Sequence, residues 1–337
     1  MNKDVFLKEK IFVAGAKGMA GSAIVRSLKK KGYGSRNYKG ELLIPTKKIL
    51  NLLDTKQVNE WFFKNNPDVV ILAAAKVGGI IANSTKPADF LLQNLKIQIN
   101  VIEAAFNSGV RRLIFLGSSC IYPKFAQQPI REESLLSSFL EQTNESYAIA
   151  KIAGIKLCQS LRSQYGFDAI SLMPTNLYGP NDNYHPINSH VMASLIRKFH
   201  EAKLKSLSKV ICWGSGNPLR EFMHVDDLGD AVVFALENWY PQSKNAPLDD
   251  LGKPLTHLNI GSKEEISIKD LANLIAREFD YNGNIFWDKT KPDGTPRKKL
   301  NSERMKKLGW SQQIKLREGI SSTIKIYAEN LSLKNIK

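Results

Sequence analysis

The sequence predicts an α/β fold built on a doubly wound parallel sheet, with a smaller α/β lobe beside it. Two observations predict this fold. Short apolar runs alternate with helical patterns through the first half of the chain, which indicates βαβ units with right-handed crossovers. The first apolar run also ends in a glycine-rich turn that opens a helix, as in a Rossmann-type sheet.

Each expected strand is a short apolar run, and each expected helix repeats apolar residues at helical spacing. The strands are expected at Ile11–Ala14, Glu41–Ile44, Val69–Ala74, Arg112–Leu116 and Ala169–Pro174. The helices are expected at Ala20–Lys31, Thr55–Asn65, Ala88–Ser108 and Tyr147–Tyr165. Strands alternating with helices of this length predict a parallel sheet.

The regular alternation ends near residue 180. Proline, asparagine and glycine concentrate in Gly179–Asn188, Gly214–Pro218 and Lys291–Pro296, which indicates long binding loops. Helical patterns recur at Ser189–Ala202, Asp226–Asn238, Ile268–Phe279 and Arg317–Leu331. We therefore predict a first domain over residues 1–180, with residues 220–240 packing back onto it, and a discontinuous lobe over residues 181–330. The aperiodic segment Trp239–Pro254 is predicted to be a surface insertion.

The composition fits a globular chain of 337 residues, with 43% hydrophobic and 24% charged residues. No apolar run reaches the roughly 18 residues that a membrane-spanning helix needs. The charged first residues lead directly into the first strand, so we expect no signal peptide. Cys120, Cys158 and Cys212 are too far apart for a zinc pattern or a disulfide framework. We therefore expect no bound metal and a reducing, cytoplasmic location.

The net charge of +16 raises the question of nucleic-acid binding. The basic residues are scattered in small groups, however, and no long basic run or aromatic-interleaved basic stripe occurs. We therefore expect no nucleic-acid partner. A positive field would instead help to collect a polyanionic small molecule.

The turn after the first strand is the clearest binding motif. Gly15, Gly18 and Gly21 have G-x-x-G-x-x-G spacing, with Lys17 and Met19 between them. Glycines let a pyrophosphate approach the backbone, and the following helix N-terminus offers N–H donors and partial positive charge. The motif predicts dinucleotide binding.

The residues after the second strand favour NADP over NAD. An NAD site usually has an acidic residue there for the ribose 2′-hydroxyl, whereas this chain has Lys47 and Lys48. Together with Lys17, these lysines can pair with a 2′-phosphate. We therefore predict NADP(H) as the cofactor.

A catalytic set follows the fourth expected strand. Ser118 comes just after that strand, and Tyr147 and Lys151 form a Y-x-x-x-K pair on one helical face. We expect the Lys151 ammonium to lower the pKa of the Tyr147 phenol. Tyr147 could then exchange a proton with a carbonyl oxygen that also accepts a hydrogen bond from Ser118.

The chain resembles the GDP-L-fucose synthase family of extended short-chain dehydrogenases over roughly residues 10–330. Several uncommon strings carry the resemblance: AAAKVGGI at Ala73–Ile80, SSCIYPK at Ser118–Lys124, PTNLYGP at Pro174–Pro180, NDNYHPINSHV at Asn181–Val191, REFMHVDD at Arg220–Asp227 and KPDGTPRK at Lys291–Lys298. The resemblance implies epimerisation at C3 and C5 of a GDP-linked 4-keto-6-deoxy sugar, followed by NADPH-dependent reduction at C4.

The resemblance also implies residue roles. Ser118, Tyr147 and Lys151 match the reductase triad, and Cys120 and His190 match the acid/base pair for epimerisation. The positions that match GDP-sugar contacts are Lys198, Trp213, Arg220 and Asp293. Those that match cofactor contacts, beyond the first loop and Lys47, are Asn51, Leu52, Leu116, Ser118, Lys151, Pro174, Asn176, Leu177 and His190.

The chemistry of a 4-keto sugar is consistent with these roles. The ketone acidifies the protons on both neighbouring carbons, and inversion needs a base on one face and an acid on the other. Cysteine and histidine both titrate near enough to neutrality for this work. Which of the two acts at which carbon stays open, and His185 is the alternative to His190.

Two features depart from the family pattern or go beyond it. Lys17 and Lys47 stand where the family commonly has arginine, which keeps the charge but loses bidentate geometry. The family also implies a homodimer through a four-helix interface, for which the two long expected helices at Ala88–Ser108 and Tyr147–Tyr165 are suited.

Other functions remain open at this stage. A 4,6-dehydratase usually has an acidic pair after the strand-end serine, where this chain has Ser119 and Cys120. A 4-epimerase would hold its cofactor without consuming external reductant. An epimerase/reductase for another GDP-linked keto sugar, such as a heptose, is hardly distinguished by sequence. A non-enzymatic sensor or nucleic-acid binder fits less well, because both Tyr147 and Lys151 are present.

Overall fold

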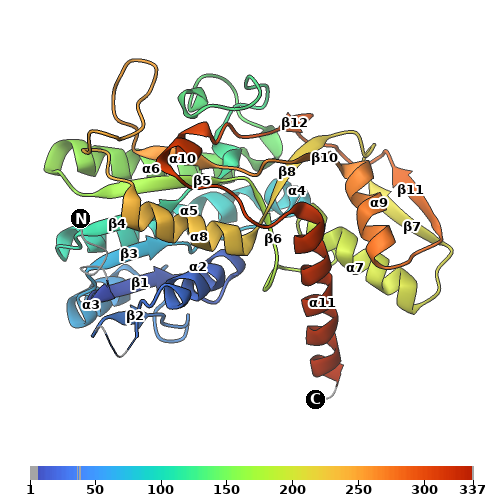
Figure 1. Cartoon of the computed structure of the whole chain (residues 1–337), viewed down its shortest axis with the longest axis horizontal. Helices are drawn as coiled ribbons and strands as arrows, with labels where there is room; N and C mark the ends of the chain where they lie inside the picture. Colours follow the sequence, from blue (N-terminus) through green and yellow to red (C-terminus); the bar gives the residue numbers. More distant parts are fainter. Residues whose placement is uncertain (1–6, 36, 38, 336–337) are drawn as a thin grey trace.

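A six-stranded parallel sheet forms the centre of the molecule in the computed structural model, which describes residues 7–35, 37 and 39–335 (Figure 1). Residues 1–6, with which the expected first domain begins, lie outside the described residues. The strands lie in the order β2-β1-β3-β4-β5-β9. Their bounds are β1 Lys10–Ala14, β2 Glu41–Leu43, β3 Val69–Leu72, β4 Arg112–Leu116, β5 Ala169–Pro174 and β9 His257–Ile260. The predicted doubly wound fold is confirmed, and β9 is an added strand that the sequence analysis did not predict.

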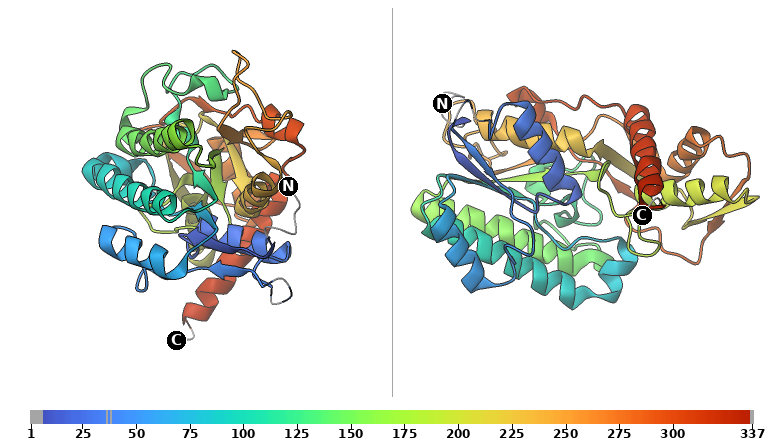
Figure 2. Two further views of the ribbon diagram at one scale, coloured as in Figure 1. Left: turned by 90° about the vertical axis from the view of Figure 1, so that its left-hand side faces the viewer. Right: turned by 90° about the horizontal axis from the view of Figure 1, so that it is seen from below.

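Helices cover both faces of this sheet (Figure 2). One hydrophobic core lies under α2 and α8, and a second lies under α3, α5 and α6. The bounds are α2 Met19–Lys30, α3 Thr55–Asn65, α4 Ile80–Thr85, α5 Pro87–Asn107, α6 Glu145–Tyr165 and α8 Val225–Asn238, with short 3-10 turns η2 Ser119–Ile121, η3 Glu132–Ser134 and η4 Gln142–Asn144. The strands β3 and β4 are buried along their whole length, as expected for a sheet covered on both sides.

Local sequence explains where several helices begin and end. The Asp54 carboxylate accepts a hydrogen bond from the Gln57 amide at the start of α3, and Ser267 does the same for Asp270 at the start of α9. Each such cap stabilises its helix by about 1 kcal/mol. The helix α6 ends at Gly166, whose φ of 71° is the left-handed conformation that glycine adopts without strain.

The lobe lies beyond the carboxyl ends of the central strands and has its own core (Figure 1). In it, β8 pairs with β10, β12 and β6, while β7 pairs with β11. The strand bounds are β6 Asn176–Tyr178, β7 Lys209–Trp213, β8 Leu219–His224, β10 Glu265–Ser267, β11 Asn284–Asp288 and β12 Arg297–Lys298. The helix bounds are α7 Val191–Leu204, α9 Ile268–Glu278, α10 Glu303–Leu308 and α11 Leu316–Asn335. No helix in the described part of the chain is long and apolar enough to cross a membrane.

The prediction of a surface insertion at Trp239–Pro254 is wrong at its beginning. The Trp239 side chain is fully buried in the core under α2 and α8. Its backbone oxygen accepts a hydrogen bond from the buried Arg112, whose guanidinium lies 4.1 Å from the Tyr240 ring centroid. The segment therefore starts by covering a buried cation, and only its later part, residues 242–254, is mostly exposed. A lack of periodicity predicted a loop but carried no information about burial.

Candidate active site

One cavity of about 590 Å³ lies between the carboxyl ends of the central strands and the lobe. It brings together most of the residues selected from the sequence, namely Gly15, Gly18, Met19, Gly21, Leu116, Ser118, Cys120, Tyr147, Lys151, Pro174, Asn176, Leu177, His190, Lys198, Trp213, Arg220 and Asp293. Parallel strands end at the same edge of a sheet, and ligands of doubly wound folds bind there. Residues more than 200 positions apart in sequence therefore line the same cavity.

The glycine turn is shaped to let a ligand approach the backbone. Gly15 has a φ of 84°, which disfavours side chains, and a Cβ on Gly21 would come within 2.1 Å of the Gly15 oxygen. The helix α2 begins directly afterwards, and no side chain caps its N-terminus at Gly18. Free N–H groups and the helix dipole therefore face the cavity, as a pyrophosphate requires. This cradle fits the phosphates of a dinucleotide.

Four predicted cofactor residues do not line the cavity. They are Lys17, Lys47, Asn51 and Leu52. Lys17 and Lys47 are exposed in the segments that follow β1 and β2. Asn51 and Leu52 are half-buried and tied to their own surroundings, since Asn51 Oδ1 accepts from the Leu53 amide and the Leu52 oxygen accepts from Asn100. Their roles stay predictions.

The Lys151 side chain is buried in the wall of the cavity. Its Nζ donates a hydrogen bond to the Leu116 oxygen at 2.8 Å and lies 4.8 Å from the Phe115 ring centroid. Burial lowers the pKa of Lys151 to about 7. A lysine with this pKa can hold or release a proton near neutral pH.

Tyr147 lies in the first turn of α6, one turn before Lys151. Burial raises the pKa of Tyr147, and the charge of Cys120 raises it further, while a hydrogen bond with Ser118 opposes the shift. The predicted lowering of this pKa by Lys151 is therefore wrong here. Lys151 does not lower the pKa of Tyr147 because its Nζ donates a hydrogen bond to a backbone carbonyl instead. Burial also favours the neutral form of Lys151.

Cys120 is the half-buried cysteine of the cavity. It lies in η2, which Ser118 caps by accepting the Cys120 amide at 3.2 Å. Two side chains donate to its sulfur: Asn144 Nδ2 at 3.5 Å and Lys298 Nζ at 3.6 Å. Cys158 is buried in the core under α3, α5 and α6, and Cys212 is buried in the lobe core, where it also borders the cavity.

His190 is the N-cap residue of α7 and opens onto the cavity, as its predicted position at a loop-to-helix boundary suggested. Desolvation lowers the pKa of His190, although the residue as a whole is exposed to solvent. The alternative, His185, is occupied as a loop cap, because its Nδ1 accepts the Ile187 and Asn188 amides at 3.2 Å. His190 is thus the histidine of the cavity wall.

The lobe supplies cations and an indole. Lys198 donates to the Ile211 oxygen at 2.7 Å and lies 5.0 Å from the Trp213 ring centroid, and Trp213 is 40% exposed rather than part of the core. Burial lowers the pKa of Arg220. Asp293 accepts hydrogen bonds from the Ser215 amide and hydroxyl, both at 2.7 Å, so it also ties two loops together. An aromatic plane flanked by cations suits a nucleotide with a diphosphate.

The cavity also contains residues to which the sequence analysis gave no role. They come from the strings AAAKVGGI, NDNYHPINSHV and KPDGTPRK, and from segments without any motif; the lining includes Val77, Gly78, Gly79, Asn83, Glu141, Asn144, Asp182, Asn188, Trp287 and Lys298. The first and second strings meet directly, because the Gly79 amide donates to the Asn188 oxygen at 3.2 Å. The motif strings signalled their importance, whereas Asn144 and Trp287 had no sequence signal.

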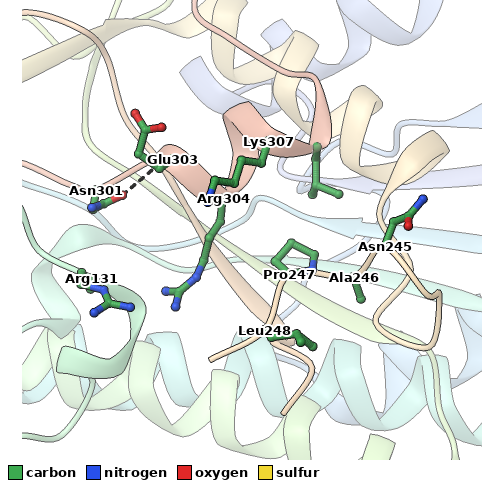
Figure 3. Close-up of a pocket in the computed structure, with 10 residues that line it drawn as sticks. Arg131, Asn245, Ala246, Pro247, Leu248, Asn301, Glu303, Arg304 and Lys307 are labelled. Carbon is green, nitrogen blue, oxygen red and sulfur yellow. Dashed lines mark hydrogen bonds between the residues drawn. The ribbon is translucent and has the colours of Figure 1, made fainter. Parts of the chain in front are cut away.

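A second cavity, of about 460 Å³, lies away from this site between the 245–248 loop and α10 (Figure 3). Its two arginines are paired with carboxylates: Arg304 with Glu132 and Glu133, and Arg131 with Asp250. These pairs join the loop, η3 and α10 to one another. Both arginines of the second cavity are therefore already engaged by carboxylates.

The comparison with known proteins agrees with this geometry. Residues 11–247 match the NAD dependent epimerase/dehydratase family. The chain is 53% identical to GDP-L-fucose synthase 1 of Arabidopsis thaliana, covering 96% of this chain and 94% of that protein. It is 49% identical to the GDP-L-fucose synthase of Escherichia coli, covering 96% and 98%. The chain belongs to the GDP-L-fucose synthase family.

A solved structure adds a view of the fold with a cofactor. The GDP-mannoheptose C4 reductase MlghC of Campylobacter jejuni, solved with NADP bound, is 34% identical with a TM-score of 0.83. The match covers 96% of this chain and 99% of that chain. The GDP-L-fucose synthase family thus shares this architecture with reductases of GDP-linked heptoses.

Proposed function

We propose that this member of the GDP-L-fucose synthase family converts GDP-4-keto-6-deoxy-D-mannose to GDP-L-fucose by 3,5-epimerisation and NADPH-dependent 4-keto reduction. The single observation that carries the proposal is that one cavity holds Ser118, Tyr147 and Lys151 together with Cys120 and His190. The first three suit reduction of a ketone, and the last two suit proton transfer at carbon. The family membership of the chain supports the same activity.

Epimerisation follows from the acidity of carbons next to a ketone. One member of the Cys120–His190 pair removes the proton from C3 or C5, and the electron pair delocalises onto the carbonyl oxygen as an enolate. The other member returns a proton to the opposite face of that carbon. Hydrogen bonds from Ser118 and Tyr147 stabilise the enolate oxygen. The same cycle at the second carbon completes the double inversion without net change in atoms or electrons.

Reduction uses the same oxygen. The glycine turn, with Lys17 and Lys47 toward the 2′-phosphate, is proposed to hold NADP(H), which supplies a hydride to C4 when bound. Tyr147 donates its phenolic proton to the C4 oxygen, and Ser118 orients that oxygen. Lys151 stands one helical turn from Tyr147 and, with a pKa of about 7, can supply the replacement proton. A phenol with a raised pKa remains protonated until this step.

The lobe is proposed to bind the GDP portion of the substrate through Lys198, Trp213, Arg220 and Asp293. The division of labour then follows the expected domains, with the first domain holding the cofactor and the lobe, including Arg220 of β8, holding the sugar nucleotide. Asn51, Leu52, Leu116, Pro174, Asn176 and Leu177 are proposed to contact the cofactor as the family pattern implies.

A homodimer through α5 and α6 is also proposed. The two helices pack side by side on one face of the sheet (Figure 2). Each presents large apolar side chains to the outside: Leu92 and Ile99 on α5, and Ile149 and Tyr165 on α6. Three cysteines that form no disulfide are consistent with a cytoplasmic location.

Another GDP-linked keto sugar is the alternative substrate. The 34% identity to a GDP-mannoheptose C4 reductase makes a GDP-linked heptose the specific alternative. The test is incubation of the enzyme with NADPH and either GDP-4-keto-6-deoxy-mannose or a GDP-4-keto-heptose, with the products assigned by NMR. We expect stoichiometric NADPH oxidation and a product of L-fuco configuration from the first. Faster turnover of the GDP-4-keto-heptose would identify it as the preferred substrate. Conversion without NADPH oxidation would indicate a 4-epimerase.

A further inference from the structure

The loop between β6 and α7, residues 179–190, lies along the cavity. Eight of its residues line the cavity: Asn181, Asp182, Asn183, Pro186, Ile187, Asn188, Ser189 and His190. The glycine turn and Lys151 line the same cavity. A ligand that fills the space between the glycine turn and Lys151 therefore contacts this loop.

Two hydrogen bonds join the loop to the sheet side of the cavity. Asn181 Nδ2 donates to Ser22 Oγ at 3.0 Å, and Ser22 lies in the first turn of α2, directly after the glycine turn. Near the other end of the loop, the Asn188 oxygen accepts from the amide of Gly79, the N-cap of α4, at 3.2 Å. The helix α2 follows β1 and α4 follows β3, and these two strands are neighbours in the sheet. The loop therefore reaches across the cavity from one βα connection to the next.

Within itself, the loop supplies acceptors for its own backbone amides. Asp182 Oδ1 accepts from the Asn183 amide at 2.7 Å, and Asn183 Oδ1 accepts from the His185 amide at 3.1 Å. His185 Nδ1 in turn accepts from two amides further along the loop. At the β6 end stands Gly179, whose φ of 141° is a conformation that other residues rarely adopt. Compact loops that are held together by their own side chains can move as units, and such loops are frequently functional.

We propose that residues 179–190 form a lid over bound NADP(H), and that Asn181 is a positioning residue that fastens this lid to α2 through Ser22. The inference goes beyond the proposed function, because it requires the cofactor but not the sugar nucleotide. Release of NADP(H) requires the lid to part from α2, so weakening the contact should speed release.

Ser22 is the better of the two residues to alter. It is not among the residues that line the cavity, and its hydroxyl donates to the Met19 oxygen at 3.1 Å, so its loss acts on the cofactor through the lid. Alanine also favours a helix more than serine does, so Ser22→Ala should fold. Asn181 has a φ of 67°, and Asn181→Gly removes the amide without adding strain at this position.

The test is the rate of NADPH dissociation, measured by stopped-flow fluorescence with excess NADP⁺ and no sugar nucleotide. We expect Ser22→Ala and Asn181→Gly each to raise this rate by about fivefold, as the loss of one hydrogen bond implies. The double variant should release NADPH no faster than the faster single variant, because both changes remove the same contact. This cycle also corrects for Arg26, whose Nη1 donates to Ser22 Oγ at 3.3 Å.

Ser322→Ala is the matched control. The Ser322 hydroxyl donates to the oxygen three residues earlier on α11, at 3.0 Å, as the Ser22 hydroxyl does on α2. Its loss should leave NADPH release unchanged. Hydrogen exchange followed by mass spectrometry adds a second readout: NADPH should slow exchange over residues 181–189 in the unaltered enzyme, and less so in Ser22→Ala.

The inference is overturned if Ser22→Ala and Asn181→Gly leave NADPH release unchanged, if Ser322→Ala speeds it equally, or if the effects of the two single changes multiply in the double variant. Its failure is distinguishable from failure of the proposed function. Fast release from the two variants without turnover of GDP-4-keto-6-deoxy-mannose would retain the lid and refute the proposed substrate. Unchanged release with normal turnover would refute the lid alone.

Discussion

The sheet and the lobe contribute to one cavity in different ways. On the sheet side, functional groups follow the ends of buried parallel strands: the glycine turn follows β1, and Ser118 and Cys120 follow β4. On the lobe side, they stand on several separate elements: Lys198 on α7, Trp213 at the end of β7 and Arg220 on β8. The sheet places groups at one common edge, whereas the lobe places them through the packing of separate helices, strands and loops. We infer that reduction depends mainly on the first region and epimerisation on the contact between the two.

The largest expected effect concerns the sheet side alone. Tyr147→Phe removes the proton donor of the reductive step and should lower kcat for NADPH oxidation by about 10³-fold, within the range of general acid catalysis. NADPH affinity should stay within about twofold, measured by fluorescence titration. Stopped-flow absorbance of NADPH gives the rate. Turnover at the original rate would remove Tyr147 from the chemistry.

The next effect separates epimerisation from reduction. Cys120→Ser replaces an ionisable thiol by a hydroxyl that stays protonated, so deuterium exchange at C3 and C5 of the keto sugar should fall by about 10²-fold. Exchange can be followed by NMR in D₂O without NADPH. Cofactor affinity is the control and should not change. Equal exchange in both proteins would exclude the thiol as an acid or base.

A smaller effect tests the contact between the regions. A Cβ on Gly79 would lie 2.5 Å from the Ser189 oxygen, so Gly79→Ala must displace the segment that leads into His190. We expect exchange to fall about tenfold, since small misplacements of reacting groups are costly. Gly252→Ala meets no atom within 4 Å but is strained by a φ of 74°, so it is the control for a destabilising glycine substitution away from the cavity. If both variants behave alike, the Gly79 contact does not position His190.

The smallest effect, taken per pH unit, is on stability and concerns buried Lys151. Its folded pKa of about 7 lies below the unfolded value of 10.5, so between these two pH values the unfolded chain binds more protons. The stability of the cofactor-free enzyme relative to Lys151→Met should therefore rise with pH above 7, by at most about 1.4 kcal/mol per unit. Urea denaturation at pH 7, 8 and 9 measures this difference. A difference that is constant or falls with pH would contradict the burial argument.

The contrast between the sheet and the lobe also explains how much of the fold could be predicted from the sequence. The strands of the first half are apolar runs bounded by turn residues, and five of the six sheet strands were predicted within two residues. The lobe strands were not predicted. Short pieces such as β10 and β12 are polar and too brief to show alternation, whereas β7 alternates between exposed and buried residues and carried a signal that was missed.

For the site, too, residues in recognisable strings could be predicted and isolated residues could not. Cys120, Tyr147 and Lys151 stand in recognisable strings, and the cavity holds all three. The partners of Cys120 could not be predicted, because Asn144 lies outside every motif and Lys298 reaches the sulfur only in the assembled fold. The pKa of Tyr147 was predicted in the wrong direction, since spacing on a helix reveals proximity but not the burial that raises it.

The most direct test of a two-region active site is the isotopic pattern of a single complete turnover. The enzyme is incubated with GDP-4-keto-6-deoxy-mannose and unlabelled NADPH in D₂O, and the product is analysed by NMR and mass spectrometry. Two inversions followed by hydride transfer predict deuterium at C3 and C5, hydrogen at C4 and L-fuco configuration. A reduced product without deuterium at those two carbons would show that Cys120 and His190 do not act as proposed.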